Sequence, residues 1–132
     1  MVLLMATLSS YCQNDKFTQG QRIYEVNCGN CHMADGKGMG KMFPDITQSA
    51  YLSTQQSELV CLIVNGKEGQ VMETVNMPGN KEITPVGINN LINYLNYTWG
   101  DKSLSKLEEV KAQFEACQWS ISRLDCTISV CS

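Results

Sequence analysis

The sequence contains a single histidine among its 132 residues, and this scarcity limits the metal chemistry open to it. One imidazole excludes a haem held by two histidines, a two-histidine zinc site and a peroxidase that needs a distal histidine. Charged residues are also few, at 17%, with ten Lys and Arg against thirteen Asp and Glu. With a net charge of −3 the chain has no excess of positive charge to attract phosphates, so we expect no nucleic-acid partner.

Long hydrophobic runs are also missing. The apolar stretch at residues 1–8 is far shorter than the roughly 20 residues of a membrane-spanning helix. It is typical of the apolar part of an export signal, and Cys12 follows at the place of a lipidated cysteine. Tyr11 stands where a lipoprotein signal prefers a small residue, so a frayed end with an incidental thiol is the alternative.

The length of 132 residues predicts one compact domain with a tail. We divide the chain into a signal remnant or lipoprotein-type N-terminus (1–14), a central domain (15–100) and a C-terminal helical extension (101–132). Seven cysteines in so short a chain indicate an oxidising compartment. We therefore expect an exported protein, either periplasmic or anchored to a membrane and facing the periplasm.

Strand signals are weak, and the chain is predicted to be all-α. Three start signals pair a hydroxyl residue with a polar partner three residues later, in the manner of a capping box: Thr18 with Gln21, Ser53 with Gln56, and Ser105 with Glu108. A fourth helix is predicted from Thr84 as cap, Pro85 at its first position and a buried stripe at Ile88, Leu91, Ile92, Leu95 and Trp99. Gly66 and Gly100 are suited to end two of these helices.

Two long irregular stretches, 34–51 and 67–83, separate the predicted helices. Loops of this length inside a small domain are usually functional or are held in place by something else. The short helices bury too little apolar surface to hold both loops. A bound cofactor would meet that need.

The sequence Cys28-Gly29-Asn30-Cys31-His32 is the Cys-x-x-Cys-His pattern of covalent c-type haem attachment. Two thiols at this spacing can each add to one vinyl group of a porphyrin, and the following histidine can bind the iron. A thioredoxin-type redox pair is the first alternative, but it requires an α/β unit that is not visible here. A structural zinc site is the second, but it requires four ligands, and these three crowded residues have no second pair to complete them.

The only histidine is used by this motif, so a sixth iron ligand must be of another kind. Met77 is the best candidate, because Pro78 and Gly79 direct the chain into a tight turn just after it. Thioether sulfur stabilises ferrous iron and raises the reduction potential. Met72 is the main rival, and a packed Met77 above a five-coordinate iron is the alternative. For Met33, Met39 and Met42 we expect core packing or surface exposure.

Two supporting features are expected around this motif. The carbonyl of Pro44 can accept the second ring N–H of His32, which would fix the tautomer of the histidine. Gly20 and Tyr24 on the first helix can meet Leu91 and Tyr94 on the last helix of the central domain, because only glycine allows two helix backbones to cross so closely. Ordinary core packing is an equally good reading of these four residues.

Together these motifs resemble those of the class I monohaem cytochromes c, in particular small exported bacterial ones. The resemblance runs from Gly20 and Tyr24 through Cys28-x-x-Cys31-His32, Pro44 and Met77-Pro78 to Leu91-x-x-Tyr94-Leu95 and Trp99-Gly100. It implies a cytochrome c fold of three to four short helices around one covalently bound haem c. It also implies a single-electron carrier, not an enzyme, that shuttles electrons between redox proteins such as a membrane oxidase or reductase. The last fifteen residues match nothing in this pattern.

Four cysteines are left after haem attachment and Cys12. We predict a Cys61–Cys117 disulfide that pins the extension to the domain, and more weakly a Cys126–Cys131 disulfide. Free buried thiols are the alternative.

Two other functions stay open beside the electron carrier. One is a haem enzyme or gas sensor with an open sixth position on the iron. The other is a haem-free interaction module in which the Cys-x-x-Cys pair is a disulfide.

Overall fold

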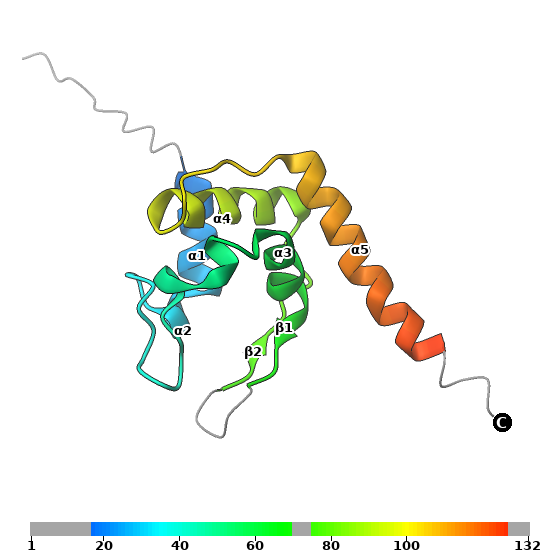
Figure 1. Ribbon diagram of the computed structural model, residues 1–132, viewed down its shortest axis with the longest axis horizontal. Helices are drawn as coiled ribbons and strands as arrows, with labels where there is room; N and C mark the ends of the chain where they lie inside the picture. The colour runs from blue at the N-terminus through cyan, green and yellow to red at the C-terminus, as the bar shows by residue number, and fades with distance from the viewer. Residues whose placement is uncertain (1–16, 70–74, 127–132) are drawn as a thin grey trace, which may run out of the picture.

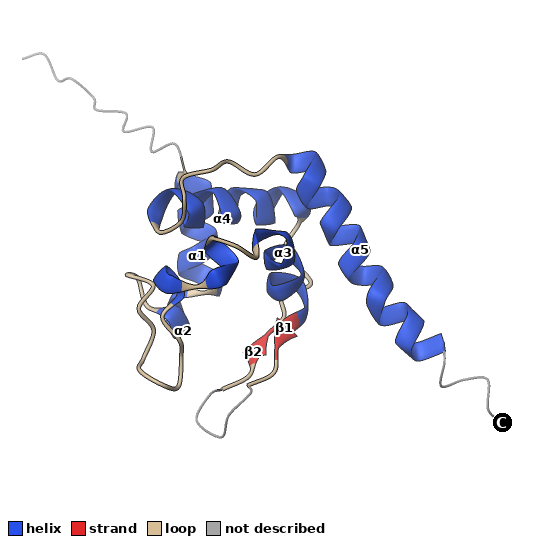
Figure 2. Ribbon diagram, viewed as in Figure 1, coloured by secondary structure: helices blue, strands red, loops and turns tan. Residues whose placement is uncertain are grey.

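The structure of the protein is a computed structural model that describes residues 17–69 and 75–126, with side chains described up to residue 118. Helices form most of this part of the chain, and the predicted all-α class is confirmed (Figure 2). The elements, in chain order, are α1 (Thr18–Asn27), α2 (Gly29–His32), the 3-10 helices η1 (Ile46–Gln48) and η2 (Ala50–Leu52), α3 (Gln56–Asn65), the strands β1 (Gly66–Lys67) and β2 (Met77–Pro78), α4 (Pro85–Thr98) and α5 (Leu107–Cys126).

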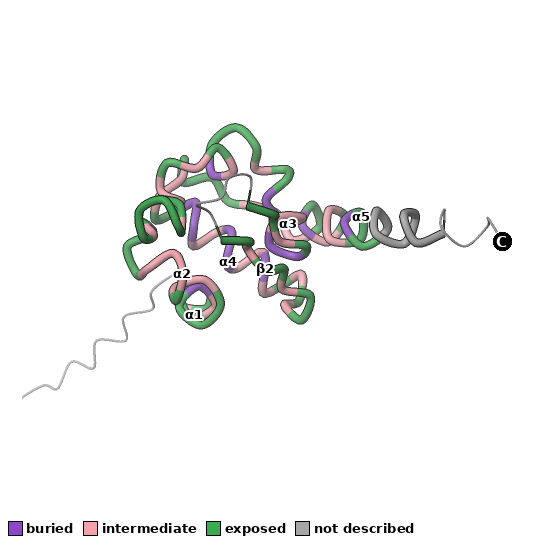
Figure 3. The backbone as a smooth tube through the Cα atoms, turned by 90° about the horizontal axis from the view of Figure 1, so that it is seen from below, coloured by how far each residue is buried: buried purple, intermediate pink, exposed green. Residues whose placement is uncertain are grey.

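Helix α4 forms as its sequence predicts. The hydroxyl oxygen of Thr84 accepts the N–H of Gly87 at 3.1 Å, and Pro85 occupies the first helical position. The predicted stripe is buried, with Ile88, Leu91, Ile92 and Leu95 each no more than 6% exposed. Together with the buried residues of α3, this face forms the centre of the core (Figure 3).

The three predicted capping boxes are wrong. At α1 the N-cap is Phe17, and the side-chain amide of Gln21 donates to Glu25 one turn further on. Helix α3 starts at Gln56 rather than after Ser53, because the segment before it is already turned into η2. The hydroxyl of Ser53 donates to the carbonyl of Ala50 instead. Gln21 and Ser53 therefore use their side chains for other hydrogen bonds within the same turn or the next.

The cap predicted for α5 fails for a tertiary reason. The hydroxyl of Ser105 donates to the amide oxygens of Asn89 and Asn93 on α4, at 3.0 Å each, and its N–H donates to Asn93 at 2.7 Å. Helix α5 starts two residues later, at Leu107. Ser105 thus ties the linker to α4 rather than starting a helix.

Helices α1 and α4 cross at Gly20. A Cβ atom at this position would lie 2.6 Å from the Cβ of Tyr94 and would overlap the carbonyl oxygen of Asn90. Tyr24, one turn further, is buried and its ring lies 5.8 Å from that of Tyr94 and 5.2 Å from that of Trp99. The predicted close crossing of the first helix and α4 is therefore present, with an aromatic cluster beside it.

Helix α5 packs against α3 and α4 and then extends away from the rest of the domain (Figure 1). Its inner face includes Val110 and Cys117, which are 2% and 1% exposed. A disulfide joins Cys117 to Cys61 of α3, with Cα atoms 5.3 Å apart, and this is the pair that the sequence favours. Cys131 and Cys12 lie outside the described residues, so the second pairing and the lipid site have no structural description.

A short antiparallel hairpin follows α3, where the sequence predicts no strand. Gly66 pairs with Pro78 and Lys67 pairs with Met77. Gly66 has a φ of +76°, which ends α3 as predicted but also turns the chain into β1. Two residues per strand are too few to show an alternating sequence pattern, so this element was not visible in the sequence.

Candidate cofactor site

A cavity of about 510 Å³ opens between α3, α4, the Cys28–His32 turn and the β1–β2 hairpin. Its walls are mainly apolar, with Leu59, Leu62 and Ile63 from α3 and Leu91 and Leu95 from α4. The two long stretches that the sequence left unexplained, 34–51 and 67–83, supply most of the remaining walls. The cavity is thus the structural reason for both loops.

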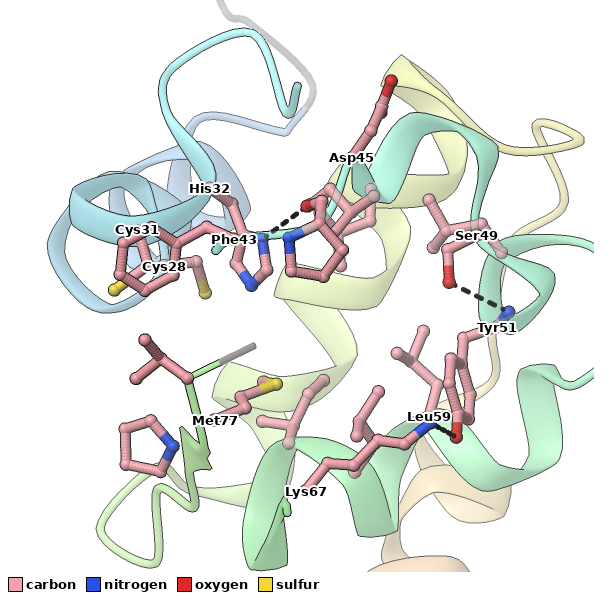
Figure 4. Close-up of a pocket in the computed structure, with 18 of the residues that line it drawn as sticks. Cys28, Cys31, His32, Phe43, Asp45, Ser49, Tyr51, Leu59, Lys67 and Met77 are labelled. Atoms are coloured by element: carbon pink, nitrogen blue, oxygen red, sulfur yellow. Dashed lines mark hydrogen bonds between the residues drawn. The ribbon is translucent and has the colours of Figure 1, made fainter. Parts of the chain in front are cut away.

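Cys28 and Cys31 lie at one side of the cavity (Figure 4). The N–H of Cys28 ends α1 by donating to the carbonyl of Tyr24 at 2.8 Å, and the N–H of Cys31 donates to Cys28 at 3.1 Å. This tight turn brings both thiols to the same wall, and both are free. Burial, together with the nearby Cys31, raises the pKa of the Cys28 thiol to about 11, so this thiol is protonated at neutral pH.

His32 ends the same turn and lies between these thiols and the segment that carries Pro44 (Figure 4). Its Nδ1 atom is 3.3 Å from the carbonyl oxygen of Pro44. A carbonyl oxygen only accepts, so Nδ1 must donate in this hydrogen bond, and Nε2 keeps its lone pair. The structure therefore brings together the pair that the sequence predicted, in the tautomer that a metal-binding histidine needs.

Gly38 allows the loop to bring Pro44 to His32, and the sequence analysis missed it. The N–H of Gly38 donates to the carbonyl of His32 at 3.1 Å, and its φ is +63°. A Cβ atom here would lie 2.7 Å from the carbonyl oxygen of Pro44. The available signal was the run of glycines at 36, 38 and 40, all with positive φ.

Tyr24 fixes the start of the loop that follows His32, at Met33. Its hydroxyl donates to the carbonyl of Met33 at 2.6 Å, and Met33 itself has a φ of +60°. Burial raises the pKa of the Tyr24 phenol far above its ordinary value, so the hydroxyl stays a donor over the whole working range. The residue after His32 is thereby fixed against α1.

Met77 projects into the cavity from β2, and Figure 4 shows its sulfur across the cavity from His32. Its position depends on two close backbone approaches, one between the two sides of the hairpin and one between the hairpin and the end of α3. A Cβ atom on Gly66 would lie 2.6 Å from the N of Gly79, and a Cβ atom on Gly79 would lie 2.6 Å from the carbonyl carbon of Asn65. Glycines at both positions let the loop press directly on the end of α3.

Asparagine side chains complete the attachment of this loop. Asn80 donates from its N–H to the carbonyl of Ile63 at 2.9 Å and from its side chain to Asn27 at 2.8 Å. The side chain of Asn76 accepts the N–H of Gly69 at 2.8 Å. Met77 is therefore held between two anchored residues rather than on a free loop.

The other methionines are placed as expected or lie outside the described residues. Met39 and Met42 are 52% and 50% exposed, and neither they nor Met33 lines the cavity. Met72, the rival ligand, falls in 70–74, outside the described part of the chain. Met77 is the only methionine of the described residues that lines the cavity.

The residues present fit a covalently attached haem. The cavity offers two free thiols at one side, a nitrogen donor with its lone pair available, and a thioether facing it, within largely apolar walls. Nitrogen and thioether ligands suit haem iron, and apolar walls suit a porphyrin face. The fold and the cavity thus define a small, mainly helical protein with a site that fits a covalently bound cofactor.

A comparison with known families supports this class directly. The family model described as Cytochrome c matches residues 17–99, which is more than half of the chain, and the chain belongs to the cytochrome c family. Membership implies a covalently attached haem c and electron transfer. The resemblance inferred from the motifs is confirmed.

Relatives of the chain are named as cytochrome c subunits of quinone alcohol dehydrogenases. The cytochrome c subunits of quinone alcohol dehydrogenases from Gluconacetobacter polyoxogenes and Komagataeibacter europaeus are each 26% identical to this chain over 121 residues. The matching subunit of Gluconobacter oxydans (strain 621H) is 25% identical over 117 residues. These matches cover 81% and 78% of this chain but only 26% and 24% of the relatives, so the chain spans about a quarter of their length.

Within the described residues, no helix has both the length and the apolar character needed to cross a membrane.

Proposed function

We propose that the protein is a single-electron carrier with one haem c, attached through Cys28 and Cys31 and ligated by His32 and Met77. The observation that carries this proposal is that His32 and Met77 face each other across the same apolar cavity that exposes both thiols (Figure 4). Pro44 is the positioning residue for His32. The proposal assigns no side chain as an acid, base or nucleophile, so the protein is not an enzyme in itself.

The chain's own residues would do three things in this function. The Pro44 carbonyl holds the His32 ring, and the anchored 76–80 loop holds Met77, so both ligands keep their places whether the centre is oxidised or reduced. The leucine and isoleucine walls exclude water from the cavity. The haem, when bound, supplies the one-electron chemistry, and a site that changes little on oxidation exchanges electrons with little reorganisation.

The partner is proposed to approach where the two loops meet. The N–H of Val75 donates to the carbonyl of Met42 at 3.3 Å, and both side chains are about half exposed, at 52% and 50%. Phe43 and Val75 also line the cavity, so this rim lies directly over its edge. Lys37 and Asp35 carry opposite charges nearby, and surface charge alone therefore does not select the partner.

A redox protein is the proposed partner. The relatives are named as cytochrome subunits of a quinone-dependent dehydrogenase, which supports a dehydrogenase, reductase or oxidase as donor or acceptor. We propose that the protein works after export, on the periplasmic side, with or without a lipid on Cys12. The proposed division is 1–14 for the leader or anchor, 15–100 for the haem domain and 101–132 for the extension.

Removal of both thiols tests the attachment. In the double variant Cys28→Ala, Cys31→Ala, we expect the covalent haem to be lost, whereas each single variant should keep one thioether bond. Denaturing mass spectrometry and the pyridine haemochrome spectrum measure this directly. Wild-type protein matured with the haem attachment machinery should carry one haem per chain, and the proposal fails if it is colourless and has the bare polypeptide mass.

The alternative is a haem enzyme or gas sensor in which the sixth position is open. The location of Met77 on the cavity wall favours the carrier. We expect the ferrous protein to bind carbon monoxide slowly and incompletely, because the thioether must first leave the iron. Stopped-flow mixing with carbon monoxide gives the rate, and fast, complete binding would favour the alternative function.

A further inference from the structure

Three polar side chains line the cavity away from its cysteines. Figure 4 shows Ser49, Tyr51 and Lys67 at one side of the cavity and Cys28 and Cys31 at the other. Ser49 lies between η1 and η2, Tyr51 lies in η2, and Lys67 lies in β1. Neither the attachment motif nor the proposed iron ligands use them.

Two hydrogen bonds connect these three residues. The ammonium of Lys67 donates to the hydroxyl of Tyr51 at 3.4 Å and lies 5.3 Å from the centre of the Tyr51 ring. The N–H of Tyr51 in turn donates to the hydroxyl oxygen of Ser49 at 3.3 Å. Lys67 keeps two further ammonium protons and Tyr51 keeps its hydroxyl proton, so the pair can still donate to an acceptor.

The acceptor for these donors is not a carboxylate of the described residues. No ion pair of Lys67 is recorded among them. Asp45 also lines the cavity, but its carboxylate accepts the N–H and the hydroxyl of Thr47 at 2.8 and 2.6 Å. Glu68 follows β1 and also lines the cavity, but among the described residues it forms no ion pair with Lys67. Lys67 is itself exposed at the edge of the cavity, where its ammonium can form a charge-assisted hydrogen bond with an anionic partner that enters the cavity.

The propionate carboxylates of a haem would supply such an anion on the side of the cavity opposite the cysteines. In the iron porphyrin of c-type centres, the two thioether bonds form on adjacent pyrrole rings, and the two propionate carboxylates stand on the other two rings. A porphyrin tethered at Cys28 and Cys31 therefore carries its carboxylates towards the opposite side of the cavity. That side is where Tyr51 and Lys67 lie.

We propose that Lys67 and Tyr51 bind a propionate carboxylate of the haem, an assignment that rests on the proposed function. Lys67 supplies the charge and Tyr51 a second donor. Lys67 is also the strand partner of Met77, so the short hairpin presents a carboxylate-binding group and an iron-binding group on facing residues. One small element would then hold the haem both at its iron and at its acidic edge.

Infrared spectroscopy of the labelled haem tests the assignment. Holoprotein is produced with 5-aminolevulinic acid that carries carbon-13 in its carboxyl group, which labels the propionate carboxylates. Redox-induced infrared difference spectra are recorded for wild type, Lys67→Gln, Lys67→Arg and Tyr51→Phe, with Lys81→Gln as the matched control. Lys81 is exposed and does not line the cavity. The reduction potential is measured on the same samples.

We expect the labelled carboxylate bands to shift in Lys67→Gln and Tyr51→Phe and to stay in place in Lys81→Gln. The reduction potential should fall in Lys67→Gln, because a positive charge near the haem favours the ferrous state, and Lys67→Arg should restore it. If Lys67→Gln yields no holoprotein, Tyr51→Phe alone decides.

Unchanged labelled bands in a variant that still carries one haem and the wild-type iron spectrum would overturn this assignment and leave the proposed function intact. A wild-type protein without covalent haem would instead refute the proposed function itself. A shift of the potential without any shift of the labelled bands would also count against the assignment, since it would show a general charge effect and no contact.

Discussion

Replacement of Met77 by leucine is expected to lower the reduction potential on the order of 0.1 V or more, since axial ligands set haem potentials over about 0.8 V. Leucine fills similar space with no sulfur to bind the iron, so the low-spin, six-coordinate spectrum should be replaced by a spectrum with an open or water-filled position. Carbon monoxide should then bind the ferrous form quickly. Potentiometric titration followed by absorption spectroscopy measures both effects.

Two matched variants make this test specific to Met77. Met42→Leu changes an exposed methionine that does not line the cavity, and we expect it to leave the spectrum and potential unchanged. Met72→Leu changes the rival candidate in the second long loop. If Met72→Leu rather than Met77→Leu alters the iron spectrum, the ligand has been assigned to the wrong methionine.

Loss of the Cys61–Cys117 disulfide is expected to destabilise the protein by about 4 kcal/mol, which is the chain-entropy value for a closed loop of this length. The bond spans 56 residues and joins α3 to α5. The double variant Cys61→Ser, Cys117→Ser removes it without leaving an unpaired thiol. Guanidinium unfolding of the ferric holoprotein, followed by circular dichroism, gives the free energy of unfolding.

Chemical labelling provides the control for this bond. We expect Cys61 to resist alkylation in unfolded, unreduced protein and to react after reduction. The reduction potential of the double variant should match that of the wild type, because neither cysteine lines the cavity. Alkylation of Cys61 without prior reduction would show that these thiols are free in the purified protein.

The parts of the structure that the sequence predicted well are those encoded within a few residues. The five residues Cys28–His32 predict haem attachment by their spacing alone. Helix α4 has its cap, its first-turn proline and its buried stripe within one continuous segment. Met77 was also favoured from a local feature, the proline and glycine that follow it. Local spacing was sufficient for the turn and for α4, and it favoured a methionine that does line the cavity, whereas iron ligation by Met77 stays a prediction.

The parts that could not be predicted depend on contacts between distant segments. Ser105 looks like a helix cap in the sequence, but α4 supplies Asn89 and Asn93 as better partners for it. The hairpin that carries Met77 exists because Gly66 and Gly79 fit against the backbone across the loop, which no short window of sequence reveals. Lys67 and Tyr51 are 16 residues apart in the chain, and neither has a motif of its own.

The position of α5 has a practical consequence. The helix is joined to α3 through Cys117, projects from the side of the domain (Figure 1), and none of its described residues lines the cavity. A gold surface or a fused enzyme attached beyond α5 would therefore leave the rim open to solution. The same domain can in this way be attached to another body by its tail while it still exchanges charge with diffusing molecules through the open edge of its cavity.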